Sequence, residues 1–178
     1  NEYPRIGGIV YEGGVNPVIS TNQFLKYRNF SGFLKHCNEV GIPFHMFPAD
    51  PGFDYSYYRN NGAYLYPSKN FIDLINELSR FDCGFVGTPI PDPEFEGAFP
   101  NKALEGIAAG IPSLIFNAKY IGEWMEKRGL GIYVRKLEDF PKAFKEVKKL
   151  RKHVKKERWL YTMEKQIKKT EKLYEQIL

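Results

Sequence analysis

The chain has 178 residues, of which 43% are hydrophobic and 16% aromatic, and its net charge is +5. This length and composition fit one compact domain with a sizeable core, and they exclude a disordered chain. Because no run of about 18 apolar residues occurs, we expect no transmembrane span, although a peripheral membrane contact stays open. The two cysteines, Cys37 and Cys83, fit neither a metal site nor a redox motif, so we expect reduced packing residues in a cytoplasmic protein.

The positive charge is concentrated at the C-terminal end. Residues 151–178 contain nine Lys or Arg and four Asp or Glu, whereas residues 1–150 carry equal numbers of basic and acidic groups. The high isoelectric point therefore belongs to the tail. This distribution argues against a domain that binds nucleic acid with its whole surface.

Apolar runs alternate with amphipathic segments along residues 1–150. In chain order, the sequence predicts a strand at 6–11, a helix at 31–40, a strand at 42–47, a polar, Tyr-rich loop at 50–62, a short strand at 64–66 and a helix at 68–78. It then predicts a strand at 83–87, a Pro- and acid-rich loop at 88–98, a helix from 100 or 101 to 109, a strand at 113–116, a helix at 118–128, a strand at 131–134 and a helix at 138–150. This alternation indicates an α/β fold, a Rossmann-like three-layer parallel sheet with helices on both faces.

Residues 151–178 are expected to form a long amphipathic helix beyond a domain of residues 1–150. Its apolar stripe consists of Leu160, Met163, Ile167, Tyr174 and Ile177, and its other face is rich in lysine. The helix either packs on its own domain with a solvated basic face, docks on a neighbouring domain, or meets a nucleic acid or membrane surface. The sequence favours the first of these arrangements, and we do not expect nucleic acid as a partner.

Two loops are expected to meet beyond the carboxyl ends of the strands, where open parallel sheets bind ligands. One is Glu12-Gly13-Gly14, whose glycines would let the backbone approach a phosphate or would simply form a turn. The other leads into the helix that begins near Asn101. Free N–H groups at a helix start favour an anion, and Lys102 adds a positive charge beside them.

Glu105 lies four residues after Asn101, on a similar side of the same helix. A carboxylate there can accept two hydrogen bonds from a vicinal diol such as a ribose. On local chemistry alone, the alternative is that Asn101 caps the helix and Glu105 complements the helix dipole. The histidines have no metal-ligand spacing, so no metal site is predicted.

A resemblance to a known family is carried by residues 99–116, FPNKALEGIAAGIPSLIF. This segment resembles the nucleotide-sugar signature of GT-B glycosyltransferases of the family 4/group 1 type, in which Pro-x-Lys-x-x-Glu precedes a small-residue helix end and a Gly-x-Pro strand. Residues 81–86 resemble the strand before the signature, and 129–134 the Gly-x-Gly segment after it. Residues 158–160 and 173–178 are similar to the family's closing helix.

The resemblance implies the C-terminal, donor-binding half of a glycosyltransferase of the hexosyltransferase type. Its donor substrate would be a UDP- or GDP-sugar, and no further cofactor would be required. Glu105 fills the place of the glutamate that binds the ribose hydroxyls, and Gly13 and Gly14 would lie near the diphosphate. The base is expected near residues 64–67, which include Tyr64 and Tyr66.

The diphosphate needs at least one cation, because pyrophosphate is a poor match for neutral surroundings. The resemblance implies a basic residue in the segment after the glycine turn, for which Arg28 and Lys26 are the candidates. Lys102 is a third candidate. We expect Arg28 and Lys102 to act in catalysis by stabilising the leaving diphosphate, and Asn101 to belong to the binding segment.

The loop before the signature departs from the family's pattern. Many relatives carry two glutamates separated by seven residues, and the first touches the donor sugar. Here that position is Gly97, and Glu96 stands beside it. Either the loop is one residue longer and Glu96 acts on the sugar, or the backbone at Gly97, Ala98 and Phe99 does so.

The hypothesis from the sequence is a domain that binds a nucleotide-diphosphate sugar and stabilises the leaving diphosphate during glycosyl transfer. The acceptor, a glycan or a small molecule, would be held mostly by an N-terminal acceptor domain. The rival hypothesis is a catalytically inactive α/β scaffold that binds nucleotides or docks partners. A third hypothesis is nucleic-acid binding through the basic tail.

Overall fold

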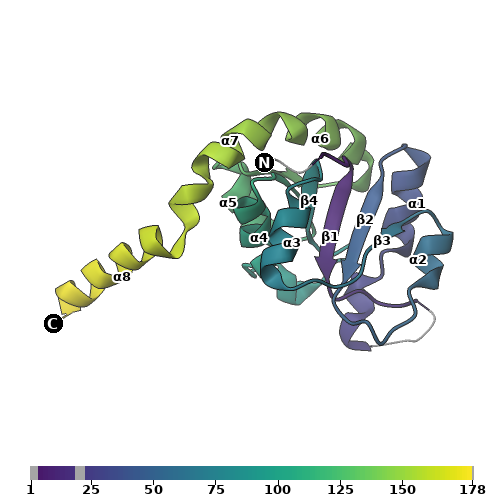
Figure 1. Cartoon of the computed structure of the whole chain (residues 1–178), viewed down its shortest axis with the longest axis horizontal. Helices are drawn as coiled ribbons and strands as arrows, with labels where there is room; N and C mark the ends of the chain where they lie inside the picture. Colours follow the sequence, from purple (N-terminus) through teal and green to yellow (C-terminus); the bar gives the residue numbers. More distant parts are fainter. Residues whose placement is uncertain (1–3, 19–22, 178) are drawn as a thin grey trace.

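The computed structural model describes residues 4–18 and 23–177, with the backbone alone for residues 23, 24, 169, 170 and 177. Figure 1 shows a sheet wrapped by helices, from which the C-terminal helix projects. No helix in the described part of the chain is long and apolar enough to cross a membrane.

Six parallel strands form one sheet in the order β3-β2-β1-β4-β5-β6. The strands are β1 (Ile9–Gly13), β2 (Phe44–Pro48), β3 (Tyr64–Leu65), β4 (Cys83–Gly87), β5 (Ser113–Phe116) and β6 (Gly131–Val134). Apart from β3 at the edge, their sequences are mostly apolar and buried, as is typical of strands covered on both faces. Ile9 pairs with Phe44 on one side and with Cys83 on the other, so β1 is a central strand.

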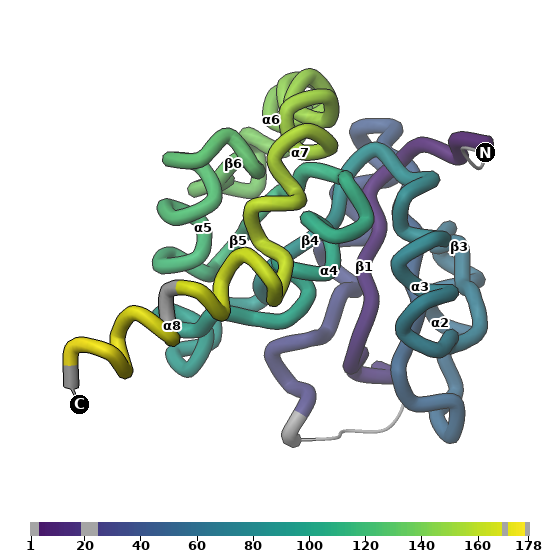
Figure 2. The backbone as a smooth tube through the Cα atoms, turned by 60° about the vertical axis from the view of Figure 1, so that its left-hand side comes forward, coloured from purple at the N-terminus to yellow at the C-terminus, as the bar shows by residue number. Residues whose placement is uncertain are grey.

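Helices cover both faces of this sheet, as Figures 1 and 2 show. They are α1 (Ser31–Glu39), α2 (Ser56–Asn60), α3 (Phe71–Leu78), α4 (Asn101–Ala109), α5 (Lys119–Glu126), α6 (Phe140–Val147), α7 (Arg151–Glu157) and α8 (Met163–Ile177). Short 3-10 turns occur at η1 (Gln23–Arg28), η2 (Pro93–Phe95), η3 (Leu137–Asp139), η4 (Lys148–Leu150) and η5 (Arg158–Tyr161). The predicted three-layer, Rossmann-like fold is confirmed.

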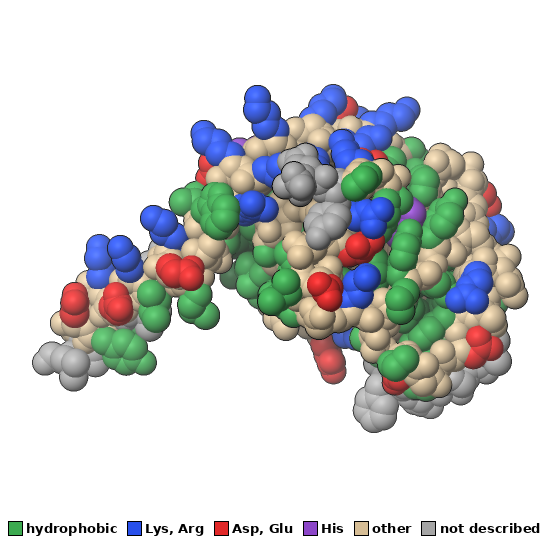
Figure 3. Space-filling model, in the orientation of Figure 1, with side chains coloured by type: hydrophobic (Ala, Val, Ile, Leu, Met, Phe, Trp, Pro, Cys, Tyr) green, Lys and Arg blue, Asp and Glu red, His purple; other side chains and the backbone are tan. Residues whose placement is uncertain are grey.

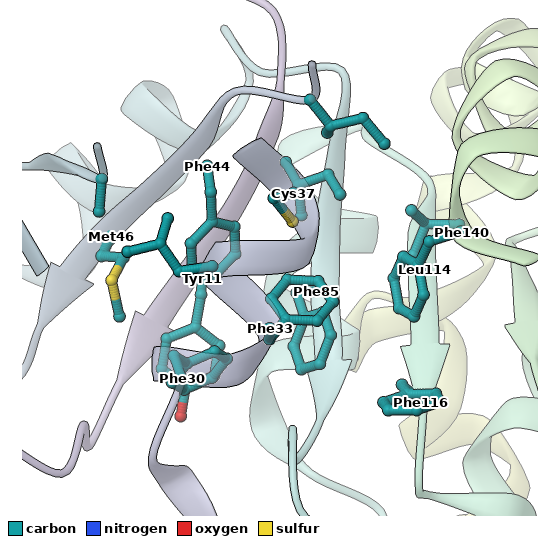
Figure 4. Packing of buried hydrophobic residues seen from close by; sticks show 14 of the residues in the cluster. Tyr11, Phe30, Phe33, Cys37, Phe44, Met46, Phe85, Leu114, Phe116 and Phe140 are labelled. Atoms are coloured by element: carbon teal, nitrogen blue, oxygen red, sulfur yellow. The ribbon is translucent and has the colours of Figure 1, made fainter. Parts of the chain in front are cut away.

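One face of the sheet packs against α1 and α6 through a cluster rich in aromatic rings (Figure 4). The ring centroid of Phe33 in α1 lies 4.8 Å from that of Phe85 in β4 and 4.9 Å from that of Phe140 in α6. All three side chains are buried. Tilted and edge-to-face ring contacts of this kind add to the stabilisation that burial gives.

The opposite face packs against α3, α4 and α5, because successive strand residues point to opposite sides. Val86 of β4 joins Ile107 of α4 and Met125 of α5 in one cluster. Val10 of β1 packs with Leu78 of α3 in another. Two packed faces hold the central strands in place, and with them the loops at their carboxyl ends.

Two elements differ from the sequence expectation. α2 lies inside the segment expected to be a polar loop; its Tyr58 is completely buried, and the hydroxyl donates to the Asn16 carbonyl oxygen at 2.7 Å. α3 begins at Phe71, three residues later than expected. Asn70 sets that start, because its side chain accepts a hydrogen bond from the Asp73 N–H at 3.0 Å.

The C-terminal tail has two parts. α7 packs on the body: Val154 is completely buried beside α4 and α5, and Arg151 donates hydrogen bonds to the carbonyl oxygens of Ser79 and Phe81. Thr162 then adopts an extended conformation, and α8 projects away (Figure 1). The helix expected to run through residues 151–178 is therefore interrupted, although a long amphipathic helix does end the described chain.

The projecting helix keeps its expected amphipathic pattern. Met163, Ile167 and Tyr174, with Leu160 in the preceding turn, are between 47% and 74% exposed. Figure 3 shows apolar side chains along one side of α8 and lysines along the other. Ile177, expected in the same stripe, lies outside the described side chains. We call the four exposed residues the apolar stripe of the C-terminal arm.

Candidate functional site

The order of the strands places a topological switch point between β1 and β4. After β1 the chain continues to β2 and β3 on one side, and it then returns to β4 on the other. At such a switch point the loops after the two strands diverge, and ligands of open α/β sheets bind there. The loops here are residues 12–14 after β1 and 88–100 after β4, and the second leads into α4.

The glycine turn after β1 is bordered by two cations. A Cβ atom added to Gly13 would lie 3.5 Å from Lys102 Nζ, and one added to Gly14 would lie 2.6 Å from an Arg28 guanidinium nitrogen. Gly13 has a φ of +118°, which favours glycine. The Tyr11 hydroxyl donates to the Gly14 carbonyl oxygen at 2.8 Å and fixes the turn. Two basic side chains from distant parts of the sequence thus lie beside the backbone of this turn.

Lys102 lies at the centre of this cluster. Its Nζ atom is 5.1 Å from the centroid of the Tyr11 ring. Burial lowers the pKa of Lys102, while the negative charges of Glu12 and Glu105 oppose that shift and Arg28 reinforces it. These interactions place two carboxyls and two basic side chains within electrostatic reach of one another.

Glu12 is a site residue that the sequence did not reveal. Burial raises the pKa of its carboxyl to about 8, Lys102 opposes this shift, and a side-chain hydrogen bond with Glu105 adds to it. One carboxyl oxygen, Oε1, is buried without a hydrogen-bond partner in the described part of the chain. A buried carboxyl with a raised pKa and one oxygen without a partner is typical of functional sites. The only signal in the sequence is an acidic residue at the end of an apolar strand.

The start of α4 differs from one expectation. Asn101 is the first helical residue and is exposed, Pro100 occupies the N-cap position, and no side chain caps the helix. The interpretation of Asn101 as the cap is therefore wrong, because its place inside the helix leaves its side chain one residue too late. An uncapped first turn keeps N–H groups available for an anion.

The segment of Glu96, Gly97, Ala98 and Phe99 lies exposed or half-buried before α4. The contacts that fix it run to the α5 side. The Glu96 carbonyl oxygen accepts a hydrogen bond from the Tyr120 N–H at 3.0 Å, and the Phe99 and Trp124 rings meet edge to face at 5.0 Å. A Cβ atom at Gly97 would meet no heavy atom within 4 Å. This loop therefore lies beside the N-terminus of α4, and the space next to Gly97 is open.

Two residues were candidates for a cation after the glycine turn, Lys26 and Arg28, and their side chains lie in different places. Both lie on η1, but Lys26 is exposed and its Nζ atom lies 4.7 Å from the centroid of the Tyr27 ring. Only Arg28 of these two borders Gly14. Arg28 also lies over the Phe95 ring, with the guanidinium carbon 5.9 Å from the ring centroid.

Tyr64 and Tyr66 lie at the other end of the sheet, on and after β3. The Tyr64 ring stacks on His45 at 4.7 Å, and the Tyr66 ring stacks on Phe47 at 4.7 Å. Tyr66 also lines a cavity of about 430 Å³ at the carboxyl ends of β2 and β3. The other lining residues include Asp50, Phe53, Asp54, Tyr55, Arg59 and Leu65. Tyr64 is not among those lining residues.

No group of three or more His, Cys, Asp or Glu side chains in the described part of the chain could hold a metal ion. Cys37 and Cys83 are buried and free, as expected. The polar chemistry of the candidate site therefore lies in its carboxyls, its cations and its backbone N–H groups.

No family model matches the sequence, and no curated protein matches it. Solved structures do match the fold. The O-GlcNAc transferase of Thermobaculum terrenum superposes with a TM-score of 0.63 at 14% identity, over 99% of this chain and 36% of that one. TarM superposes with a TM-score of 0.64 at 10% identity, over 98% and 36%. The pneumococcal O-GlcNAc transferase GtfA, solved with UDP and GlcNAc, superposes with a TM-score of 0.63 at 11% identity, over 98% and 36%.

These identities are low, so the likeness concerns the fold. It confirms, at that level, the resemblance to GT-B glycosyltransferases that the sequence indicates. The chain spans little more than a third of the length of each of these proteins.

Proposed function

We propose that the chain is the donor-binding part of a glycosyltransferase and that it binds a nucleotide-diphosphate sugar, a UDP- or GDP-sugar, at the switch point between β1 and β4. The observation that carries this proposal is the meeting of Gly13, Gly14, Arg28 and Lys102 beside Glu105. A glycine turn, two cations and an uncapped helix start suit a diphosphate.

The charges of the site support this ligand. Because burial raises the pKa of Glu12 to about 8, its carboxyl adds little negative charge at neutral pH to the basic side chains of Arg28 and Lys102. A diphosphate would offset the remaining positive charge. The same cations would stabilise the negative charge that develops on the diphosphate as the bond between its terminal oxygen and the sugar breaks. A new bond then forms from an acceptor oxygen, which loses its proton.

Glu105 is the proposed ribose ligand. It lies three residues after Lys102, so the two side chains emerge from one side of α4. A carboxylate in that position can accept hydrogen bonds from both hydroxyls of the ribose while the lysine reaches the diphosphate. Asn101 lies one turn earlier on the same side, in reach of the same ligand.

The remaining parts of the donor are assigned by position. The cavity that Tyr66 and Tyr55 line, beyond β2 and β3, would receive the base against aromatic walls. The open loop at Glu96–Phe99 would receive the sugar, through the Glu96 carboxylate or the backbone of residues 97–99. Neither assignment selects between uracil and guanine.

The acceptor and the rest of the active site are proposed to come from outside this chain, in an N-terminal acceptor domain. Two observations support this: the chain spans 36% of the length of the matched glycosyltransferases, and its arm carries an exposed apolar stripe. An exposed stripe on a projecting helix favours docking on another domain. Efficient transfer of sugar to a glycan by residues 1–178 alone would contradict this division.

Calorimetric titration of UDP, GDP and ADP into the full chain tests the proposal. We expect at least one nucleoside diphosphate to bind, and Glu105→Ala to weaken that binding at least about tenfold, because a hydrogen bond to a charged group contributes roughly 1.5–3 kcal/mol. Glu123→Ala, which removes an exposed carboxylate from α5, is the matched control and should bind as the wild type does.

Two results of this titration would contradict the proposal. If none of the three nucleotides binds to the wild type, the donor-domain proposal fails, and the inactive α/β scaffold becomes the better description. If both variants lose affinity equally, Glu105 is not the ribose ligand.

A further inference from the structure

A second charged feature lies away from the switch point. A groove of about 950 Å³ runs between α3, α4, α7 and η5. It borders Leu104 and residues 107–109 of α4, and its lining contains neither Lys102 nor Glu105 of the candidate donor site. We call this feature the basic groove.

One wall of the basic groove is cationic. Its basic lining residues are Arg5, Lys148, Lys149, Arg151, Lys152, Lys155 and Arg158, and its described lining contains no Asp or Glu. Two of the cations are neutralised at the rim, since Arg5 pairs with Asp82 and Lys149 pairs with Glu146 at 2.7 Å. Figure 3 shows lysine and arginine side chains gathered along α6 and α7, above this region.

Part of this charge has an ordinary structural role. Arg151 donates to the Ser79 carbonyl oxygen at the end of α3, and Arg158 donates to the Ala108 carbonyl oxygen at 3.4 Å near the end of α4. Cations at helix C-termini satisfy such carbonyls and complement the helix dipole. These bonds hold the two guanidinium groups in place without cancelling their charge.

The structural role leaves several groups unexplained. Lys152 of α7 is exposed along the groove, and so is Lys148 of η4, whose Nζ atom lies over the Phe144 ring, 4.4 Å from the ring centroid. The Arg158 Nε atom is buried, and it has no hydrogen-bond partner in the described part of the chain. A buried donor without an acceptor is costly, and an anion in the groove would supply the acceptor.

Apolar side chains line the same groove, and one of them lies against its cations, since the Arg158 guanidinium carbon is 4.8 Å from the centroid of the Trp159 ring. Leu104 of α4 is 42% exposed and Trp159 of η5 is 61% exposed, and both line the groove together with Ile75 of α3. Exposed large apolar groups beside a row of cations suit a ligand with two chemically different parts.

We propose that the basic groove binds a phosphate-bearing amphiphile, with its phosphate on the Lys148–Arg158 wall and its apolar part on Leu104, Trp159 and Ile75. The site is separate from the donor site and does not depend on the function proposed above. Its ligand differs from a nucleotide sugar, because the apolar side chains of the groove would contact an apolar group next to the phosphate.

The test is calorimetric titration of the full chain with a short-chain phosphatidic acid below its micelle concentration. Phosphatidylcholine with the same chains is the neutral-headgroup comparison, and inorganic phosphate is the comparison without chains. We expect phosphatidic acid to bind more tightly than either, and the double variant Lys148→Gln/Lys152→Gln to weaken that binding about tenfold. The matched control Lys165→Gln/Lys168→Gln removes two exposed charges from α8, outside the groove, and should change the affinity less than about twofold.

The proposal fails if phosphatidic acid does not bind, if phosphatidylcholine or inorganic phosphate binds equally well, or if the two double variants lose affinity equally. A saturating concentration of UDP should leave the affinity unchanged. Competition by UDP would place the probe in the donor site and would likewise contradict the basic groove as its site. Thermal denaturation of both variants shows whether a loss of binding reflects a loss of folding.

Discussion

Glu12 gives the site a pH dependence whose sign follows from its pKa. Burial raises that pKa from 4.5 to about 8, so the folded chain holds a proton on Glu12 at pH values where the unfolded chain has released it. The protonated carboxyl therefore favours the folded state most below about pH 4.5, and this contribution is lost as the pH rises towards 8. Ionised Glu12 makes the fold less stable despite the nearby Lys102.

The substitution Glu12→Gln tests this linkage, because glutamine resembles the neutral carboxyl at every pH. We expect the free energy of unfolding of the variant to exceed that of the wild type by on the order of 2 kcal/mol at about pH 9, and the difference to vanish near about pH 5. Urea denaturation across this range measures it, with Glu123→Gln as the exposed control. Equal differences at both pH values would show that Glu12 titrates normally.

Gly14 is expected to matter for binding more than for stability. A Cβ atom there would lie 2.6 Å from the end of the flexible Arg28 side chain, which would move away from the turn. We expect Gly14→Ala to weaken binding of a nucleoside diphosphate about five- to tenfold, since a charge-assisted contact is lost, and to change stability by less than about 1 kcal/mol.

Calorimetry with UDP and thermal denaturation measure these two effects. Gly32→Ala on α1 is the control, because its added Cβ atom would meet no heavy atom within 4 Å. Unchanged UDP affinity in Gly14→Ala would show that Arg28 does not contact the diphosphate.

At the scale of residues, the sequence predicted the parts of the candidate site that follow a local pattern. The glycine turn, Lys102 and Glu105 stand at fixed places after a strand or within the first turns of a helix, and the structure brings them together. Glu12 could not be predicted as a buried carboxyl, because its burial and its bond to Glu105 depend on how β1 and α4 pack. The same holds for the choice between Arg28 and Lys26.

The join between β4 and the loop that follows it depends on one glycine. Gly87 has a φ of +109°, and a Cβ atom there would lie 1.9 Å from the Phe116 carbonyl oxygen of β5. We expect Gly87→Ala to lower the free energy of unfolding by about 3 kcal/mol or more, because both the backbone strain and the overlap with β5 must be relieved. Urea denaturation measures the loss, and a loss under about 1 kcal/mol would contradict this close approach.

At the scale of elements, the strands were predicted well and some helices less well. The buried strands are apolar runs bounded by Gly, Pro or polar residues, and β5 has the predicted bounds 113–116. α2 was missed because its segment is polar and Tyr-rich, and it forms around Tyr58, whose hydroxyl is held by the Asn16 carbonyl oxygen. A short helix stabilised by a distant partner has no periodic pattern to reveal it.

The whole molecule divides into a packed body that includes α7 and an arm formed by α8. Val154 is completely buried, whereas Ile167 is 47% exposed. We expect Val154→Ala to lower the free energy of unfolding by about 2 kcal/mol and Ile167→Ala to change it by less than about 0.5 kcal/mol. Urea denaturation of the two variants compares them directly. Equal losses would mean that the arm packs as tightly as the body.

The surplus of positive charge at the C-terminal end is distributed over both the body and the arm. Arg151, Lys152, Lys155 and Arg158 of α7 and η5 line the basic groove, together with Lys148 and Lys149 of η4. The described lysines of α8, which are Lys165, Lys168 and Lys172, lie on the arm. Counting charges revealed the surplus but not its two locations, because the interruption at Thr162 decides which lysines face the body.

The strand order has a consequence for how the chain folds as it is synthesised. β1, β2 and β3 emerge first and can pair among themselves, but the second edge of β1 stays open until β4, more than 60 residues later, is available. An open edge on a central apolar strand can pair with the wrong chain. Completion of β4 and of the Gly87 turn is therefore the step that closes this edge, and variants that delay it should aggregate during folding even where the finished fold tolerates them.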